Sequence, residues 1–194
     1  MAVNTEDLQT IEDLQTGAPA ASRKRLKSRD PIHADILDFL TDELVLLDTD
    51  QHEEWLQILA PDIIYSIPQR KTRHKRDGDP FDSKGNLFSD TKRNLEVRVQ
   101  RSVVIRSAFD RDPPPRIRRF MSNLIVYETE LPHVFEAESY ILLLRSQSDD
   151  PNWDIMCGRR EDIVRETPDG FRLARRTVFL DQAALGALFL NVFM

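Results

Sequence analysis

The sequence has 194 residues, with 27 Lys and Arg residues against 33 Asp and Glu residues and a formal charge of −6. A chain of this length forms one domain of ordinary size with its own core. No apolar run reaches the roughly 18 residues that a membrane helix needs, so an integral membrane protein is excluded. The acidic balance argues against a dedicated nucleic-acid binder, whose affinity comes mainly from neutralising phosphates. We therefore expect neither a membrane nor a nucleic acid among its partners.

The cysteine content and the first residues indicate a compartment. The single cysteine, Cys157, excludes an intrachain disulfide, a CxxC redox pair and a multi-cysteine metal site within this chain. The opening residues MAVNTEDLQTIEDLQT are acidic and lack the apolar stretch of a secretory signal or the arginines of a transit peptide. These features predict a cytoplasmic protein.

Residues 1–29 are predicted to form a flexible tail, and residues 30–194 one folded domain. The tail contains a near-duplication (TEDLQT, IEDLQT), a GAPAAS stretch and a basic run at 23–29. Little apolar surface is present there to offset the entropy of ordering. The basic run is interpreted as solvated, with docking to an acidic partner as the alternative.

The domain is expected to begin with a helix. Asp30 is a favourable N-cap residue, and Pro31 suits the first helical position. Apolar residues then recur at spacings of three and four, which predicts a helix ending near residues 48–50. The residues of this stripe are Ile32, Ile36, Leu40, Leu44 and Leu47.

A second short helix, a strand and a long loop should follow. The second helix is expected to start at Thr49 or Asp50, to turn Trp55, Leu56 and Leu59 inward, and to end at Pro61. Residues 63–68 are largely β-branched or aromatic and predict a short strand. Residues 69–90 are polar, basic in their first half and rich in turn formers, so we expect a surface loop there.

The remainder predicts one further helix and four strands. The helix is expected at 91–106, with Leu95, Val99 and Val103 facing inward, before the run Pro113–Pro115. The strands are expected at 116–128, 134–146, 153–167 and 171–180, with Pro168-Asp169-Gly170 as a hairpin signal. Helices followed by strands, without βαβ alternation, predict an α+β fold. About three helices would pack on one face of a strongly curved, mixed but mostly antiparallel sheet.

The sequence ends in the apolar run ALGALFLNVFM, which contains Phe189 and Phe193. Such a run is not stable free in water and is too short to cross a membrane. It should therefore either complete the core of the domain or be buried against another subunit.

Cofactor chemistry has little support in the residues. The four histidines, at positions 33, 52, 74 and 133, show no His-x-x-x-His or Glu-x-x-His pair, so a two-His-one-carboxylate iron site is not indicated. Neither GxGxxG, GxxxxGK[ST] nor GxSxG occurs. Cys157 lies in an apolar strand, where a buried, unreactive thiol is expected.

Acid–base chemistry in a cavity of the curved sheet remains possible at this stage. The candidates are Asp62, Tyr65, His74 and His133, although the residues favour the structural alternative, which is a turn residue, a core aromatic and two surface histidines. Arginines make up 21 of the 27 basic residues, and many fall on predicted strands. Guanidinium groups suit ion pairs and protein interfaces, which favours an obligate oligomer, although solvated surface pairs need no partner.

Several short motifs, in this order, resemble one family. They are the helix end from Glu43 to Asp48, the block WLQILAPDI at 55–63 followed by Tyr65, Pro68 and Arg70, the segment RIRRFMSN at 116–123, the segment GRRED at 158–162, Arg175-Arg176 before Phe179-Leu180-Asp181, and the ending LNVF at 190–193. From about residue 32 onward the chain resembles the small (β) subunit of aromatic-ring-hydroxylating dioxygenases, which are Rieske-type non-haem iron oxygenases of bacterial aromatic catabolism.

The resemblance implies an NTF2-like or SnoaL-like cone, similar to nuclear transport factor 2 and ketosteroid isomerase. It also implies an α₃β₃ hexamer with contacts between the β subunits. The [2Fe–2S] cluster and the mononuclear Fe(II) are then expected in the large (α) subunit. This chain would be a non-catalytic, structural part of an oxidoreductase, with no catalytic, cofactor-binding or metal-binding residues. The holoenzyme would take electrons from NAD(P)H through a reductase, with or without a ferredoxin, and would cis-dihydroxylate an aromatic ring.

Under this interpretation we expect the loop after Pro68 and the strand at 116–123 to face the large subunit, because both are basic. The interface candidates are Arg70, Arg73, Arg76, Arg116, Arg118, Phe189 and Phe193. The alternative is a stand-alone isomerase, dehydratase or cyclase of the same cone fold, with Asp62 or a histidine as base, or a non-catalytic ligand-binding domain.

Overall fold

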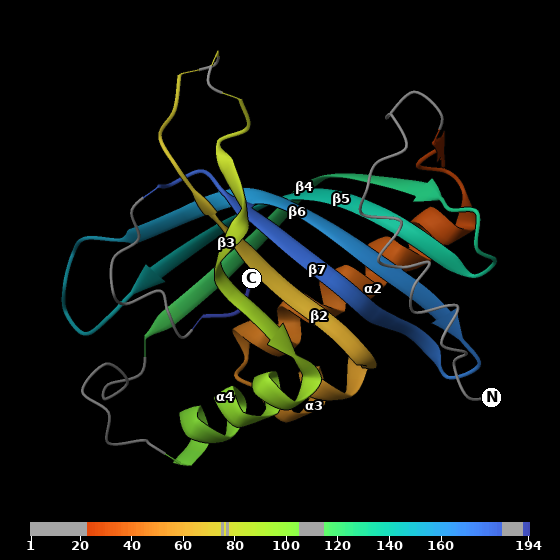
Figure 1. The fold of residues 1–194 in the computed structure, drawn as a ribbon. Coiled ribbons are helices and arrows are strands. Elements are labelled where there is room, and N and C mark those ends of the chain that lie inside the picture. Colours follow the sequence, from red (N-terminus) through yellow and green to blue (C-terminus); the bar gives the residue numbers. More distant parts are fainter. Residues whose placement is uncertain (1–22, 75, 77, 105–114, 184–191) are drawn as a thin grey trace.

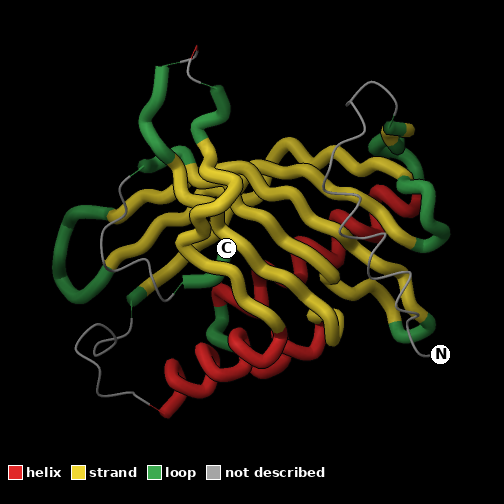
Figure 2. Tube along the Cα trace, in the orientation of Figure 1, coloured by secondary structure: helices red, strands yellow, loops and turns green. Residues whose placement is uncertain are grey.

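The computed structural model describes residues 23–74, 76, 78–104, 115–183 and 192–194. Its centre is a curved sheet of seven strands in the order β1-β4-β5-β6-β7-β2-β3. The three helices lie on one side of this sheet, and the other side carries no helix in the part of the chain described (Figures 1 and 2). The predicted α+β architecture is therefore confirmed.

Helix α2 (Pro31–Asp48) follows the prediction closely. The Asp30 carboxylate accepts a hydrogen bond from the Ile32 N–H at 3.1 Å, which satisfies one of the free N–H groups of the first turn. The helix ends at Thr49, whose N–H donates to the Val45 carbonyl oxygen. The predicted apolar stripe packs against the sheet: Ile36, Leu40, Leu44 and Leu47 are buried, and Ile32 is partly buried.

Helix α3 (His52–Ile58) is shorter than expected, and Gln51, not Thr49 or Asp50, holds the N-cap position. Its Trp55 is fully buried, as predicted. Strand β2 (Leu59–Arg70) begins earlier than the predicted strand and runs through Pro61. The pairing of β2 with β7 is irregular between Leu59 and Ile64, and such a bulge accommodates a proline that has no N–H to donate.

The expected loop at 69–90 is wrong in its second half, which forms strand β3 (Phe81–Thr91). This strand pairs antiparallel with β2 at one edge of the sheet, from Ile64 opposite Thr91 to Arg70 opposite Phe81, with two register shifts. An edge strand is held by backbone hydrogen bonds on one side only and tolerates polar, turn-forming residues. Helix α4 (Lys92–Val104) follows, with Leu95 and Val99 buried as expected; the predicted inward position of Val103 is outside the described side chains.

The four later strands match their predicted ranges within one residue: β4 (Arg116–Glu128), β5 (Val134–Ser146), β6 (Asp154–Thr167) and β7 (Gly170–Leu180). Gly170 has φ +97°, a left-handed conformation that glycine adopts without strain in the β6–β7 hairpin. Neighbouring strands are antiparallel except β2 and β7, which are parallel. The sheet is thus mixed and mostly antiparallel, as predicted.

The predicted tail boundary after residue 29 lies too late in the chain. Strand β1 (Lys24–Arg25) pairs with the edge of β4, and the Leu26 N–H donates to the Val126 carbonyl oxygen at 2.8 Å. Leu26 is buried, so it supplies the apolar contact that the composition of the segment did not suggest. Residues 1–22 of the predicted tail are outside the described residues.

Candidate functional site

The helix-covered face of the sheet contains a buried network of charges. Arg176 on β7 is fully buried between Glu43 on α2 and Asp162 on β6. Its Nη1 and Nη2 atoms donate to the two Glu43 carboxylate oxygens at 2.5 and 2.7 Å. Its Nε and Nη2 atoms donate to the two Asp162 oxygens at 2.8 Å each. The guanidinium group therefore bridges a helix and a neighbouring strand through two bidentate pairs.

A second buried arginine completes the network. The Arg160 Nη1 atom lies 3.8 Å from a Glu43 oxygen, and its Nε donates to the Ser139 hydroxyl at 3.2 Å. The Trp55 indole N–H donates to Glu43 at 3.0 Å. Two arginines thus face two carboxylates, Glu43 and Asp162, and the formal charge of the network cancels inside the core.

This balance decides the protonation states. Burial disfavours the charged form of Glu43, but the adjacent Arg176 and Arg160 charges and their hydrogen bonds hold its pKa below the ordinary value. Burial likewise opposes the charge of Arg176, yet Asp162 and Glu43 raise its pKa well above the usual value. Burial and the Arg176 charge lower the pKa of Arg160. The network consequently fixes charges and does not poise a proton for transfer.

The predicted acid–base candidates do not converge on a cavity. Asp62 forms a bidentate pair with Arg165 at 2.9 and 2.5 Å. Tyr65 is buried, and its hydroxyl is bonded to the backbone of Met194. His74 is exposed, and the exposed His133 forms a 2.9 Å contact with Glu166. Each of these residues has a structural role or faces solvent, so none has the setting of a general base.

No metal centre is formed by the residues that the structure describes. The histidines at 33, 52, 74 and 133 lie on separate elements, and no group of three or more His, Cys, Asp or Glu side chains among these residues could hold an ion. Within the same part of the chain, none of the helices is both long enough and apolar enough to cross a membrane.

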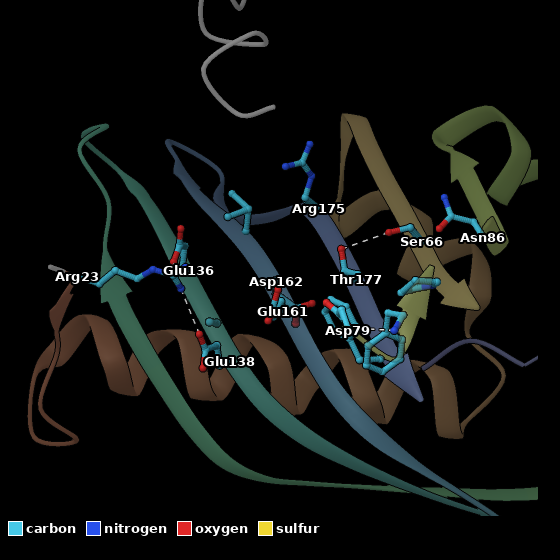
Figure 3. A pocket seen from close by; sticks show the side chains of 15 residues that line it. Arg23, Ser66, Asp79, Asn86, Glu136, Glu138, Glu161, Asp162, Arg175 and Thr177 are labelled. Atoms are coloured by element: carbon cyan, nitrogen blue, oxygen red, sulfur yellow. Dashed lines mark hydrogen bonds and ion pairs between the residues drawn. The ribbon is translucent and has the colours of Figure 1, made fainter. Parts of the chain in front are cut away.

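The helix-free face of the sheet carries a polar pocket of about 430 Å³. Figure 3 shows Glu136 and Glu138 on β5 and Glu161 on β6 projecting from neighbouring strands, with Arg23 reaching them from the side. Arg23 lies 2.9 Å from Glu136 and 3.2 Å from Glu138. Glu138 and Glu161 face each other directly in the strand register. The pocket is therefore a site where negative charge exceeds the nearby positive charge.

Nearby arginines only partly offset the cost of burying the negative charges of this pocket. Burial raises the pKa of Glu136, and the Arg23 charge only partly opposes that effect. Burial also raises the pKa of Glu161, although Arg159 forms an ion pair with it. The ionised forms of Glu136 and Glu161 are thus stabilised less by their surroundings than the ionised form of Glu43 on the opposite face.

Beside this pocket the helix-free face exposes large apolar side chains. Phe120 and Tyr140 are each 53% exposed, Ile155 is 54% exposed and Leu142 is 37% exposed. Phe120 pairs with Leu142 across β4 and β5, so these residues share one face. We call Phe120, Tyr140, Leu142 and Ile155 the outer patch. A clustered apolar surface of this kind marks a contact with another macromolecule.

Sequence reasoning missed the outer patch, although a signal was present. The segment Ile141–Leu144 on β5 is apolar at four successive positions. A strand with only one covered face alternates apolar and polar residues, whereas a continuous apolar run indicates that both faces become covered. Among the described residues the helices cover only one face, so the apolar run on β5 leaves part of its side chains exposed on the other.

Cys157 differs from its predicted state because it is half-buried and lies on the helix-free face, opposite Leu142 in the register. Its Sγ lies 3.5 Å from an Asp181 carboxylate oxygen. Burial and this carboxylate raise the pKa of the thiol, so little thiolate forms at neutral pH. The expectation of a fully buried thiol is therefore wrong, and partial burial together with the Asp181 carboxylate opposes ionisation of the thiol.

The predicted interface residues occupy different settings. Arg70 donates to the Leu180 carbonyl oxygen at 3.3 Å and lies over the Phe81 ring. Arg73, Arg76, Arg116 and Arg118 are exposed. The prediction that Phe193 lies at an interface is wrong, because this residue is only 3% exposed and packs inside the chain's own core. Phe189 is outside the described residues.

Fold and surface together define a class: an α+β cone whose interior is occupied by its own side chains and whose outer face exposes a cluster of apolar side chains. The family model for the ring hydroxylating beta subunit matches residues 42–187. The chain is 35% identical, over 79% of its length, to the 3-phenylpropionate/cinnamic acid dioxygenase subunit beta of Photorhabdus laumondii subsp. laumondii, and covers 87% of that protein. The chain belongs to the family of ring-hydroxylating dioxygenase β subunits.

Solved structures agree on the fold. A naphthalene 1,2-dioxygenase chain superposes with a TM-score of 0.74 at 20% identity, over 99% of this chain and 95% of that one. The benzoate 1,2-dioxygenase β subunit from Burkholderia mallei superposes with a TM-score of 0.65 at 21% identity, over 84% of this chain and 99% of that one. The fold is the NTF2-like α+β cone. As a β subunit, the chain is part of an oxidoreductase complex, with an α subunit as its partner.

Proposed function

We propose that this chain is the non-catalytic, structural subunit of an oxygenase that cis-dihydroxylates an aromatic ring. The observation that carries the proposal is the occupied interior: the space between α2, α3 and the sheet, where a cavity enzyme of this fold would hold its substrate, contains the neutral network of Glu43, Asp162, Arg160 and Arg176. The formal charges there cancel, and both carboxylates are paired with a guanidinium group, so the network offers no free acid or base to a substrate.

The large subunit would then hold the [2Fe–2S] cluster and the mononuclear Fe(II), and would receive electrons from NAD(P)H through a reductase, with or without a ferredoxin. The assembly we propose is α₃β₃ with contacts between β subunits, since closed symmetric rings are the common outcome of repeated subunit contacts. A cytoplasmic location is part of the proposal, and the presence of one cysteine, which is not in a disulfide, supports it.

The large subunit is proposed to bury the outer patch together with the exposed Arg116 and Arg118 on the same face of β4. Exposed arginines beside aromatic side chains are typical of protein interfaces. The loop after Pro68, with Arg70, Arg73 and Arg76, is proposed to extend this surface.

Co-expression with the Rieske-type large subunit encoded nearby tests the proposal. We expect the chain alone to be colourless and the co-purified complex to be brown and much larger on size-exclusion chromatography. A colourless chain that never associates with the large subunit, or that turns over a substrate by itself, would contradict it.

The basic loop has its own test. Replacing Arg73 and Arg76 by Glu should weaken assembly with the large subunit at low salt, because the charge that steers association is reversed. Replacing Lys71, in the same loop, by Gln is the matched control for a single lost charge. A hexamer unaffected by the double reversal would remove the loop from the interface.

A further inference from the structure

The last three residues of the sequence lie in the interior of the cone as a bound ligand would. Val192 and Phe193 are buried, and Met194 is fully buried. They contact α3, α4, β2, β4 and β7 through side chains that come from distant parts of the sequence. Their contacts divide into an aromatic subsite and a polar subsite.

The aromatic subsite holds the Phe193 ring. The centre of this ring lies 4.5 Å from that of Trp55 and 6.5 Å from that of Tyr65, which meets it edge-on. The Arg98 guanidinium group lies 4.8 Å from the ring centre. Stacking, edge contact and a cation–π contact on one ring give this subsite a preference for an aromatic side chain.

The polar subsite recognises the backbone of the same segment. The Tyr65 hydroxyl accepts a hydrogen bond from the Met194 N–H at 2.9 Å and lies 3.1 Å from the Met194 carbonyl oxygen, to which it donates. Arg176 Nη1 donates to that oxygen at 2.9 Å. Arg119 Nε donates to the Phe193 carbonyl oxygen at 2.9 Å. Three side chains thus bind the Met194 N–H and the carbonyl oxygens of Phe193 and Met194.

The side chains that form the two subsites are held by other contacts as well. Glu43 fixes the Trp55 indole, Asp48 binds Arg119 Nη1 at 2.6 Å, and Asp162 binds Arg176. A site whose walls are positioned by their own neighbours retains its geometry when its occupant leaves, which is the condition for binding in trans.

We propose that Trp55, Tyr65, Arg119 and Arg176 form a peptide-binding site that residues 192–194 occupy in cis, and that a peptide of the same sequence can occupy in their place. The ligand class is a short apolar peptide with an aromatic side chain, recognised by that ring and by two successive carbonyl oxygens. Occupation by the chain's own residues also explains why no substrate can enter from solvent at this position.

A variant that ends at Asn191, made in a Trp153→Phe background so that Trp55 alone reports, tests the proposal. We expect a lowered melting temperature and an altered Trp55 fluorescence, both restored in a concentration-dependent manner by the peptide acetyl-Val-Phe-Met. The peptide acetyl-Val-Ala-Met is the control and should restore neither. Equal effects of the two peptides, or no effect of either on a folded variant, would overturn the proposal.

The full-length chain provides a second measurement in case the shortened variant does not fold. Hydrogen exchange at the Met194 amide should be slow, and Tyr65→Phe should accelerate it by about fivefold to tenfold through loss of the acceptor. Ser66→Ala, on the opposite face of β2, is the matched control and should leave the rate unchanged. A Met194 amide that exchanges in the parent as fast as in an unstructured peptide would overturn the proposal. Neither measurement depends on assembly with the large subunit, so failure here and failure of the proposed function are distinguishable.

Discussion

The two faces of the sheet use charged residues in opposite ways. On the helix-covered face, Glu43 and Asp162 are matched by Arg160 and Arg176 at full burial. On the helix-free face, carboxylates face one another in a pocket, and one arginine, Arg23, is shared between two of them. Charge is balanced where the chain closes on itself and unbalanced where its surface remains available.

The apolar residues follow the same division. Trp55, Tyr65 and Phe193 are buried against each other beneath the helices, whereas the outer patch is exposed on the other side of the same strands. Buried charge pairs and aromatic packing therefore stabilise the fold on the helix-covered face, and association is proposed for the other. Variants on the two faces should therefore affect different measurements.

The largest effect is expected from Arg176→Met on the helix-covered face. It leaves Glu43 and Asp162 buried without their main partner, which costs about 3–5 kcal/mol of folding stability. Urea unfolding measures the loss. Arg172→Met, at a half-buried arginine that bonds to nearby backbone oxygens, is the control and should change stability by less than about 0.5 kcal/mol. Similar losses in both variants would contradict the importance of the network.

Glu43→Gln should show a distinct dependence on pH. The pKa of Glu43 in the folded chain lies below its ordinary value of about 4.3, so its ionised form stabilises the fold above that pH. This contribution is lost as the pH falls through the folded-state pKa. The stability difference between parent and variant should therefore be large at pH 7 and shrink on acidification, as followed by unfolding at a series of pH values. A difference that grows with acid would reverse the assigned direction.

On the helix-free face, Phe120→Ser combined with Leu142→Ser should reduce co-purification with the large subunit while leaving the melting temperature of the isolated chain within a few degrees. Removing exposed apolar groups costs little folding energy but weakens an interface that would bury them. Thr91→Ala with Glu130→Ala, at two other exposed positions, is the control for double substitution. Unchanged co-purification would show that the partner does not cover the outer patch.

The smallest effect is expected from Glu136→Gln, with a pH dependence opposite to that of Glu43→Gln. Burial raises the pKa of Glu136, so this group favours the fold when protonated and that contribution is lost as the pH rises through the raised pKa. The variant should melt at a higher temperature than the parent at pH 7 and at nearly the same temperature at pH 4. Thermal unfolding at the two values measures this, and a gain confined to pH 4 would contradict it.

Much of the fold could be predicted because its signals are local. The Asp30 cap, the stripe of α2 and the turn at Gly170 act within a few residues, and each lies where it was expected. Strand β3 was missed because its pairing with β2 comes from backbone hydrogen bonds between segments and leaves no period in its polar sequence. Strand β1 was missed for the same reason.

The candidate site could likewise be predicted only in part from the sequence. The family followed from ordered motifs, and the absence of ligand-spaced histidines was visible in the sequence; the non-catalytic role stays a proposal. The pairing of Glu43 with Arg176, 133 positions away, could not be predicted from the sequence. A charged residue within an apolar stripe gives no sign of its partner, and only the folded sheet places β7 beneath α2. The sequence by itself therefore determined the helix and hairpin signals, the α+β class and the need to bury an apolar ending. Only the tertiary structure decided that Phe193 is buried within its own chain while Phe120 is exposed on the opposite face, since long-range packing alone assigns a side chain to one face of a sheet.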